Sequence, residues 1–193
     1  MQLLKERIRA DGRVLPGNIL KVDCFLNHQL DPQLMQAIGR EFAEHFRDAG
    51  VTKILTIEAS GIAVALMTAL ELDVPVLFAK KTRAKTQHED IYASEVTSYT
   101  RGETRTVTVS ARYLKSGDRV LILDDFLAMG EATQGLVSIV KQAGAELVGV
   151  GIVVEKGFQE GGRRLREQGV PIHSLVVIEE LSEAGVRFAG DDC

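Results

Sequence analysis

The sequence predicts an α/β protein built on a doubly wound, mostly parallel sheet, and three observations lead to this prediction. Apolar runs of strand length recur at Lys53–Glu58, Val74–Lys80, Arg119–Asp124 and Leu147–Glu155. Segments with helical spacing lie between several of them, and strand–helix–strand alternation is typical of parallel sheets. The runs are continuously apolar, as expected for strands that are covered on both faces.

The first 30 residues predict small elements outside this alternation. Residues 1–10 have the pattern of a short amphipathic helix, and Asp11-Gly12 ends it. Leu15–Asn18 contains Pro16 and Gly17 and is predicted to form a turn. Ile19–Leu26 is interpreted as a short strand or an extended arm.

Three helices are expected around the strands. The first begins at Pro32, with Asp31 as its N-cap, and ends before Gly50. Its apolar residues keep helical spacing; they are Leu34, Met35, Ile38, Phe42 and Phe46. The other two are Gly61–Leu72 and Glu131–Ala143.

Two regions depart from the alternation. Lys81–Glu89 is polar and basic without an apolar period, and we expect a mobile loop there. Tyr92–Tyr99 and Thr104–Val109 flank Thr100-Arg101-Gly102-Glu103, which suggests an antiparallel hairpin. The segment Phe158–Cys193 is expected to hold one short helix and one or two short strands.

Length and composition favour one globular domain. The chain has 193 residues, of which 45% are hydrophobic and 26% charged, and its net charge is -4. Because nucleic-acid binders usually present a basic surface, no nucleic-acid partner is expected. The first residues have no signal-peptide pattern and no apolar run reaches the ~20 residues that span a bilayer, so no membrane partner is expected. The sparse cysteines Cys24 and Cys193 indicate reduced thiols and a cytoplasmic protein.

The segment Val120–Thr133 is where chemistry is expected. Its apolar strand ends at Asp124-Asp125, and a short loop then leads to a helix. Ligands of open α/β sheets bind beyond the carboxyl ends of strands, and a helix N-terminus favours phosphate. The two acids suit sugar hydroxyls or a magnesium shell. From this pattern alone, however, an ordinary solvated strand end is the more common explanation. A receiver-type phosphoacceptor pocket is disfavoured, because the next strand ends in Glu155-Lys156 and supplies no Asp.

This segment resembles the motif that binds 5-phosphoribosyl 1-pyrophosphate (PRPP) in type I phosphoribosyltransferases. The resemblance covers the chain from Met1 to about residue 190 and is greatest to the members that act on xanthine. It rests on Leu20–Asp23, Phe25–Gln29, Ile57–Ala63, Val120–Ala132, Gly135–Ala145 and Gly149–Phe158. It implies a type I phosphoribosyltransferase fold in a single domain, residues 1–193. A small hood of about 1–30 and 156–193 would cover a core of about 31–155.

The resemblance also implies roles in PRPP binding. Asp124 and Asp125 would be the catalytic acids that contact the ribose hydroxyls. The 5′-phosphate would be held by loop N–H groups of Ala128, Met129, Gly130, Glu131 and Ala132, with the Thr133 hydroxyl nearby. Many members have Thr or Ser before the glycine, so Ala128 and Met129 are a departure that shifts binding onto backbone amides. We expect the Glu131 side chain to point to solvent in the first turn of its helix.

A second group of residues is implied at the pyrophosphate and the base. Ala59, Ser60 and Gly61 would cradle pyrophosphate, although Ser60-Gly61 alone suggests a plain helix N-cap. For xanthine, the resemblance implies Leu20, Asn27, Lys156 and Phe158. Lys156 would donate to the 6-oxo and N7 edge, Phe158 would stack, and Asn27 would contact the 2-oxo edge. Without the resemblance, a solvated strand-end lysine and a core aromatic are the preferred explanations of Lys156 and Phe158. For Asn27 the alternative is a turn residue.

The implied reaction converts xanthine and PRPP into xanthosine 5′-monophosphate (XMP) and pyrophosphate, a step of purine salvage. Mg²⁺ would arrive with PRPP, and the protein would be a homodimer. Lys81, Arg83 and Lys85 are candidates for a lid that meets pyrophosphate charge. Two alternatives stay open: a PRPP-sensing purine regulator of the same fold, or an enzyme for another base such as guanine or hypoxanthine. The regulator is disfavoured because about 50 residues precede the first core strand, without a helix-turn-helix pattern.

Overall fold

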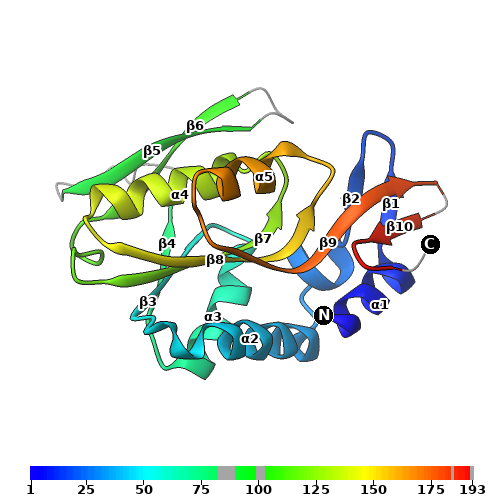
Figure 1. Ribbon diagram of the computed structural model, residues 1–193, viewed down its shortest axis with the longest axis horizontal. Coiled ribbons are helices and arrows are strands. Elements are labelled where there is room, and N and C mark those ends of the chain that lie inside the picture. The colour runs from blue at the N-terminus through cyan, green and yellow to red at the C-terminus, as the bar shows by residue number, and fades with distance from the viewer. Residues whose placement is uncertain (82–89, 99–102, 184, 192–193) are drawn as a thin grey trace.

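A six-stranded sheet forms the centre of the molecule, with the strand order β10-β9-β8-β7-β3-β4 (Figure 1). The computed structural model describes residues 1–81, 90–98, 103–183 and 185–191. All neighbouring strands run parallel except β10, which is antiparallel to β9. The strands are β3 (Lys53–Ile57), β4 (Val76–Ala79), β7 (Arg119–Leu127), β8 (Glu146–Lys156), β9 (Ile172–Ser182) and β10 (Gly185–Phe188). The predicted α/β class is confirmed.

Helices cover both faces of this sheet (Figure 1). On one face lie α2 (Pro32–Phe46), the 3-10 turn Arg47–Ala49 and α3 (Gly61–Leu72). On the other lie α4 (Glu131–Gln142) and α5 (Glu160–Glu167). Each face has its own apolar core, the first around Phe42, Val64 and Leu121 and the second around Leu136, Ile122 and Leu165. The doubly wound arrangement is therefore confirmed.

The predicted N-cap of α2 is confirmed in its atomic detail. The Asp31 carboxylate accepts the N–H groups of Gln33 and Leu34 at 3.0 and 3.1 Å, and Pro32 occupies the first turn. These contacts satisfy two backbone donors that the helix itself cannot pair. No helix among the described residues is long and apolar enough to cross a membrane.

The predicted hairpin is confirmed as β5 (Ile91–Ser98) and β6 (Glu103–Ser110). It packs over α4, where the Gln142 amide donates to the Ala93 carbonyl at 2.9 Å. Lys80 and Thr108 exchange two backbone hydrogen bonds, which join the hairpin to the end of β4. Residues 82–89 of the predicted loop Lys81–Glu89, with Arg83 and Lys85, and the hairpin tip at 99–102 lie outside the described residues.

The N-terminal arm differs from its prediction. Helix α1 (Gln2–Asp11) and the short pair β1 (Arg13–Leu15) and β2 (Ile19–Lys21) are present. Beyond Lys21, however, the chain forms a π-helical segment, Asp23–Asn27, so the expected strand or arm through Leu26 is wrong there. The reason is that Phe25 and Leu26 are both fully buried. Consecutive residues of a strand point to opposite faces, whereas a helical turn places both in the core.

The C-terminal part also differs, because β9 is 11 residues long and lies inside the sheet. Its first part pairs with β8 as far as Ile178, and its last part pairs only with β10. Polar residues lie in both parts, His173 and Ser174 in the first and Glu179 and Glu180 in the second, and they shorten the apolar run that marks a buried strand. This mixture explains why the sequence suggested only short strands.

Strand β7 extends three residues past its predicted end at Asp124. Its pairing with β3 stops at Ile122, whereas its pairing with β8 continues to Leu127 opposite Glu155. The two acids therefore lie where β7 leaves β3, and not at the end of the strand as predicted. This divergence opens a crevice at the carboxyl edge of the sheet, which is the usual place for a ligand in such folds.

Candidate active site

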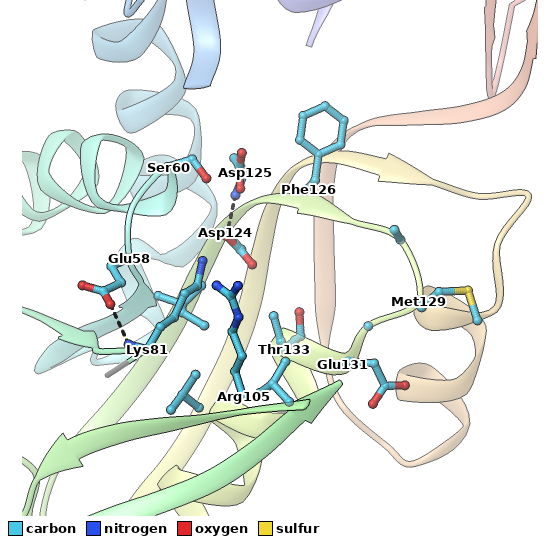
Figure 2. A pocket seen from close by; sticks show the side chains of 16 residues that line it. Glu58, Ser60, Lys81, Arg105, Asp124, Asp125, Phe126, Met129, Glu131 and Thr133 are labelled. Atoms are coloured by element: carbon cyan, nitrogen blue, oxygen red, sulfur yellow. Dashed lines mark hydrogen bonds between the residues drawn. The ribbon is translucent and has the colours of Figure 1, made fainter. Parts of the chain in front are cut away.

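A cavity of about 390 Å³ lies at this crevice. It is bordered by the ends of β3 and β7, the N-terminus of α4 and the strands β5 and β6 (Figure 2). Its lining combines acidic, basic and small residues, as expected for a charged ligand that also carries hydroxyls. The lining residues are Ile57, Glu58, Ser60, Lys81, Val96, Arg105, Val107, Asp124, Asp125, Phe126 and the run 128–133.

Asp124 and Asp125 face this cavity although both side chains are buried. The Asp124 carboxylate accepts the Asp125 backbone N–H at 3.0 Å. Burial raises the pKa of Asp124 well above its ordinary value, and the negative charge of Asp125 is the second cause. Two adjacent buried carboxylates need a cation or hydroxyl donors as partners, and a bound ligand can supply them.

The loop between β7 and α4 forms one wall. All six residues that were assigned to the 5′-phosphate, Ala128 to Thr133, line the cavity. Gly130 precedes α4 with φ of 81°, a conformation that favours glycine, and no side chain caps the helix. The backbone N–H groups of the first turn of α4 are therefore the donors that this wall offers to an anion.

Glu131 does not point freely to solvent, and this expectation is corrected. Its carboxylate accepts a hydrogen bond of 2.6 Å from Arg164 of α5, and its side chain is 25% exposed. The same guanidinium donates to the Met129 carbonyl at 2.9 Å. An acid beside a phosphate site raises the electrostatic energy of a bound anion, and a paired arginine compensates for that charge.

The turn between β3 and α3 forms the opposite wall. Ser60 lines the cavity, whereas Ala59 and Gly61 do not. Ser60 occupies the N-cap position, but its side chain makes no capping hydrogen bond, so the plain N-cap explanation is not what the structure shows. A Cβ on Gly61 would lie 2.2 Å from Thr56 Oγ1 and 3.2 Å from Asp124 Oδ1. Only glycine lets α3 begin this close to the acids.

Two basic side chains approach the acids from the hairpin side. Lys81 and Arg105 extend toward Asp124 in Figure 2, and Lys81 lowers the pKa of that carboxyl in opposition to its burial. The Lys81 backbone N–H donates to the Glu58 carboxylate at 2.6 Å. Arg105, Glu58 and Phe126 were missed by sequence reasoning. Arg105 sits in a strand of alternating polar residues, and only the folding of the hairpin over α4 identifies it.

The residues assigned to the base lie outside this cavity. Leu20 is buried in the first core, and Asn27 and Phe158 are exposed. Lys156 donates to the Asn18 carbonyl at 2.9 Å, and burial lowers its pKa. This contact joins the end of β8 to the turn between β1 and β2, so it brings the N-terminal arm to the C-terminal segment. An ammonium has three donors, so Lys156 retains others for a ligand.

Glu155, at the end of β8, belongs to a separate cluster. Its buried carboxylate accepts two hydrogen bonds from Arg166, at 2.6 and 2.7 Å, and one from Ser174. It does not line the cavity. Glu155 therefore supplies no third acid to the Asp124–Asp125 pair, which is what a receiver-type pocket would need.

The described residues contain no cluster of three or more His, Cys, Asp or Glu side chains that could hold a metal alone. Asp124 and Asp125 provide two carboxylates at one edge of the cavity. Magnesium is commonly bound by one or two carboxylates together with substrate phosphates and water. The donor set therefore fits a magnesium ion that enters with a phosphorylated ligand.

Comparisons with known proteins agree with this geometry. Residues 28–183 match the phosphoribosyl transferase domain family. Over 188 residues the chain is 55% identical to a xanthine phosphoribosyltransferase of Oceanobacillus iheyensis, covering 97% of both chains. It is 53% identical to one of Bacillus thuringiensis, covering 97% of this chain and 95% of the relative.

Solved structures show the same fold. An adenine phosphoribosyltransferase of Trypanosoma brucei, in complex with AMP, pyrophosphate and ribose-5-phosphate, aligns with a TM-score of 0.77 at 23% identity over 98% of this chain and 84% of that one. An adenine phosphoribosyltransferase of Rhodothermus marinus aligns with a TM-score of 0.74 at 25% identity over 92% and 99%. These alignments agree with the expected fold.

Proposed function

The chain belongs to the phosphoribosyl transferase family, and on that premise we propose that it is a xanthine phosphoribosyltransferase of purine salvage. It transfers the 5-phosphoribosyl group of PRPP to N9 of xanthine, which gives XMP and pyrophosphate. The observation that carries the proposal is the cavity in which the two acids face a phosphate-type loop and the Ser60 turn. The identity of 53–55% with xanthine phosphoribosyltransferases over almost the whole chain supports the choice of base.

The cavity suits PRPP along its whole length. The loop of residues 128–133 offers backbone N–H groups to the 5′-phosphate, and the adjacent Asp124 and Asp125 accept hydrogen bonds from the ribose hydroxyls. The Ser60 turn and Lys81, on the other side of the acids, suit the pyrophosphate. In this pose the anionic groups lie near N–H donors and cations, and the hydroxyls lie near carboxylates.

Catalysis in this pose consists mainly of positioning and electrostatic stabilisation. The bond from C1′ to the pyrophosphate oxygen breaks, N9 of the base attacks C1′, and the N9 proton leaves to solvent or a nearby base. The ribose carries positive charge in the transition state. Asp124 and Asp125 stabilise that charge while they hold the hydroxyls. Asp124 and Asp125 would help to hold a magnesium ion that arrives with PRPP, and such an ion would supply positive charge for the leaving pyrophosphate.

The base is proposed to bind beside the hood, between the N-terminal arm and the end of β8. Lys156 supports this because its contact with Asn18 brings both segments together. Leu20 and Asn27 belong to the arm, Phe158 follows Lys156, and Phe126 extends from β7 at the edge of the cavity. An amide and a cationic donor suit the oxo groups of xanthine.

The activity is tested by incubating the protein with magnesium, PRPP and one purine at a time and measuring pyrophosphate release. We expect release with xanthine, and a lower kcat/KM with guanine and hypoxanthine. Absence of release with every purine would contradict the enzyme and leave a PRPP-binding regulator as the explanation. A preference for adenine would contradict the role of Lys156.

The base site is tested by Asn27→Ala. This change should raise the KM for xanthine by about two- to tenfold, since a lost hydrogen bond to a ligand is worth roughly 0.5–1.5 kcal/mol. The KM for PRPP should change by less than about twofold, because the PRPP cavity does not include Asn27. Equal effects on both constants would place Asn27 outside the base site.

We propose that the enzyme acts as a homodimer in the cytoplasm. Leu66 and Leu70, one turn apart on α3, are 49% and 68% exposed, and Phe78 is exposed on the edge strand β4. Exposed apolar side chains of this size favour a protein interface. The exposed free thiol of Cys24 suits a reducing compartment. Light scattering after size exclusion should give twice the chain mass of 21.1 kDa, and a monomer would contradict the dimer.

A further inference from the structure

Helix α5 supports the phosphate loop from behind. The Gly161 N–H donates to the Ala128 carbonyl at 3.1 Å. A Cβ on Gly161 would lie 2.3 Å from that carbonyl oxygen and 2.6 Å from the Gly130 nitrogen, so the loop rests directly on the backbone of α5. Helix α5 follows the segment that we propose to bind the base, and its sequence has no motif that indicates a role in phosphate binding.

Arg164 follows Gly161 by about one turn of α5 and holds two further residues of the loop, Met129 and Glu131. Its guanidinium donates to the Met129 carbonyl at 2.9 Å and to the Glu131 carboxylate at 2.6 Å. Together with Gly161, it therefore fixes two consecutive carbonyls, those of Ala128 and Met129. In Figure 2 the side chains of Met129 and Glu131 point away from the acids.

These carbonyl contacts determine where the loop amides point. In a planar trans peptide, the N–H lies on the side opposite the C=O. Holding the Ala128 and Met129 carbonyls against α5 thus directs the N–H groups of Met129 and Gly130 away from it. Among the described residues no acceptor receives either N–H group. Since Ala128 and Met129 bring no hydroxyl, the direction of these amides decides how well a phosphate is bound.

The second effect of Arg164 is electrostatic. Glu131 lines the cavity, and its negative charge would oppose the 5′-phosphate dianion. The ion pair with Arg164 compensates for that charge, and both side chains are only partly exposed, at 38% and 25%. The guanidinium is the suitable group, because it donates in two directions at once and keeps its charge at all physiological pH values.

Resting on the proposed function, we propose that Arg164 is a positioning residue for the 5′-phosphate of PRPP. It fixes the direction of the loop amides through the Met129 carbonyl and neutralises Glu131. It touches neither the reacting atoms nor the base. The neighbouring Arg163 provides a matched control, because it pairs only with Glu160 and Glu167 of its own helix among the described residues and is 64% exposed.

The test compares Arg164→Ala, Arg164→Lys and Arg163→Ala in steady-state kinetics and ligand binding. Arg164→Ala should raise the KM for PRPP and the Kd for ribose 5-phosphate by about tenfold, the lower end for charge-assisted hydrogen bonds. The Kd for pyrophosphate and the KM for xanthine should change by less than about twofold. Arg164→Lys keeps the positive charge but loses the guanidinium that donates in two directions. Its KM for PRPP and its Kd for ribose 5-phosphate should therefore lie between those of wild type and Arg164→Ala. Arg163→Ala should resemble wild type.

Glu131→Gln, added to Arg164→Ala, separates the two effects. Removal of the unpaired carboxylate should restore part of the affinity for ribose 5-phosphate, and absence of any recovery would contradict the electrostatic role. The proposal fails if Arg164→Ala resembles Arg163→Ala, or if binding of pyrophosphate weakens as much as binding of ribose 5-phosphate. If Arg164→Ala does not fold, the Arg164→Lys variant carries the same comparison. An inactive wild-type enzyme would instead contradict the proposed function.

Discussion

At the residue scale, the site contains groups that lower the stability of the ligand-free protein and that are suited to bind a ligand. Asp124 and Asp125 are buried side by side, and the pKa of Asp124 is raised chiefly by that burial. Lys81 is the one group outside the acid pair that lowers the pKa of Asp124. We expect this acid pair to lower the stability of the ligand-free protein, because buried charges without full pairing destabilise the fold.

Asp124→Asn should therefore stabilise the ligand-free protein and impair the enzyme. A carboxyl with a raised pKa in the folded state stabilises the fold at low pH, and this contribution is lost as pH rises from about 4 through the folded pKa. The variant should have a higher Tm than wild type at pH 8, by a few degrees, since each kcal/mol corresponds to about 2–4 °C. At pH 4 the difference should nearly vanish. Thermal unfolding as a function of pH measures both.

The same variant should lower kcat/KM by about a hundredfold, because in the proposed pose Asp124 accepts hydrogen bonds from the ribose hydroxyls and would help to hold the cation. Asp48→Asn is the matched control, since it removes one exposed acid in the 3-10 turn Arg47–Ala49 that follows α2. It should change neither activity nor the pH dependence of Tm. A lower Tm for Asp124→Asn at pH 8 would show that the carboxylate is stabilised by its neighbours and would contradict the raised pKa.

Which residues could be predicted from sequence depends on how local their signal is. Asp124, Asp125 and the loop from Ala128 to Thr133 are contiguous, so a strand, two acids and a helix start indicated one candidate site, and the resemblance to the PRPP motif made it specific. Arg105 and Arg164 reach the same cavity or its loop from elements far away in the chain. Neither has a local pattern that distinguishes it from a solvated arginine, so only tertiary contacts reveal them.

At the element scale, the continuous apolar strands were predicted best. The cores of β3, β7 and β8 are buried on both faces and have uninterrupted apolar runs. The errors occur where tertiary contacts override the local pattern. Strand β7 continues past its acids because β8 supplies a partner as far as Glu155. Strand β9 has polar residues where it leaves β8 to pair with β10 alone.

The ends of β8 and α5 are joined by the Glu155–Arg166 pair, which gives a prediction for stability. Burial tends to raise the pKa of Glu155, but the hydrogen bonds from Arg166 and Ser174 outweigh it, and the pKa is lowered. Arg166→Ala leaves this carboxylate short of two hydrogen bonds. We expect a loss of about 1–3 kcal/mol, less than for a fully buried pair because Arg166 is 44% exposed.

The pH dependence of this loss has a definite sign. A lowered pKa gives stability that is present above the unfolded pKa and is lost as pH falls through the folded pKa. The difference between wild type and Arg166→Ala should therefore be full at pH 7 and shrink below about pH 4. Urea unfolding at both pH values measures it. Arg163→Ala should cost less than about 0.5 kcal/mol, and an equal cost for both arginines would contradict a special role of the Glu155 pair.

At the scale of the whole molecule, the two ends of the chain close one side of the fold. The Met1 amino group donates to the Leu175 carbonyl at 2.7 Å, and α1 contacts β9 and β10. Lys5 and Arg9 of α1 pair with Asp191 at 3.1 and 2.6 Å. Lys156 and Asn18 then join this assembly to the end of β8. The base site is thus proposed to depend on contacts between residues more than 130 positions apart in sequence, which no local pattern specifies.

Asp191→Asn tests whether this closure supports base binding. The hydrogen bond from the Phe188 N–H is the main cause that lowers the pKa of Asp191 to about 2, and hydrogen bonds from Lys5 and Arg9 contribute. The carboxylate is therefore charged throughout the physiological range. An amide keeps the shape and removes the charge that both cations bind. Amide exchange in α1 and β10 should become about two- to fivefold faster, as expected for the loss of ion pairs that are partly exposed. The KM for xanthine should rise by a similar factor, because Leu20 and Asn27, which we propose to bind the base, belong to the N-terminal arm, whereas the KM for PRPP should not change. A rise in the KM for PRPP alone would contradict this prediction, because it would mean that the hood supports PRPP binding. Unchanged amide exchange in α1 would show that the apolar contacts of Leu4 and Ile8 hold the helix without the charge of Asp191.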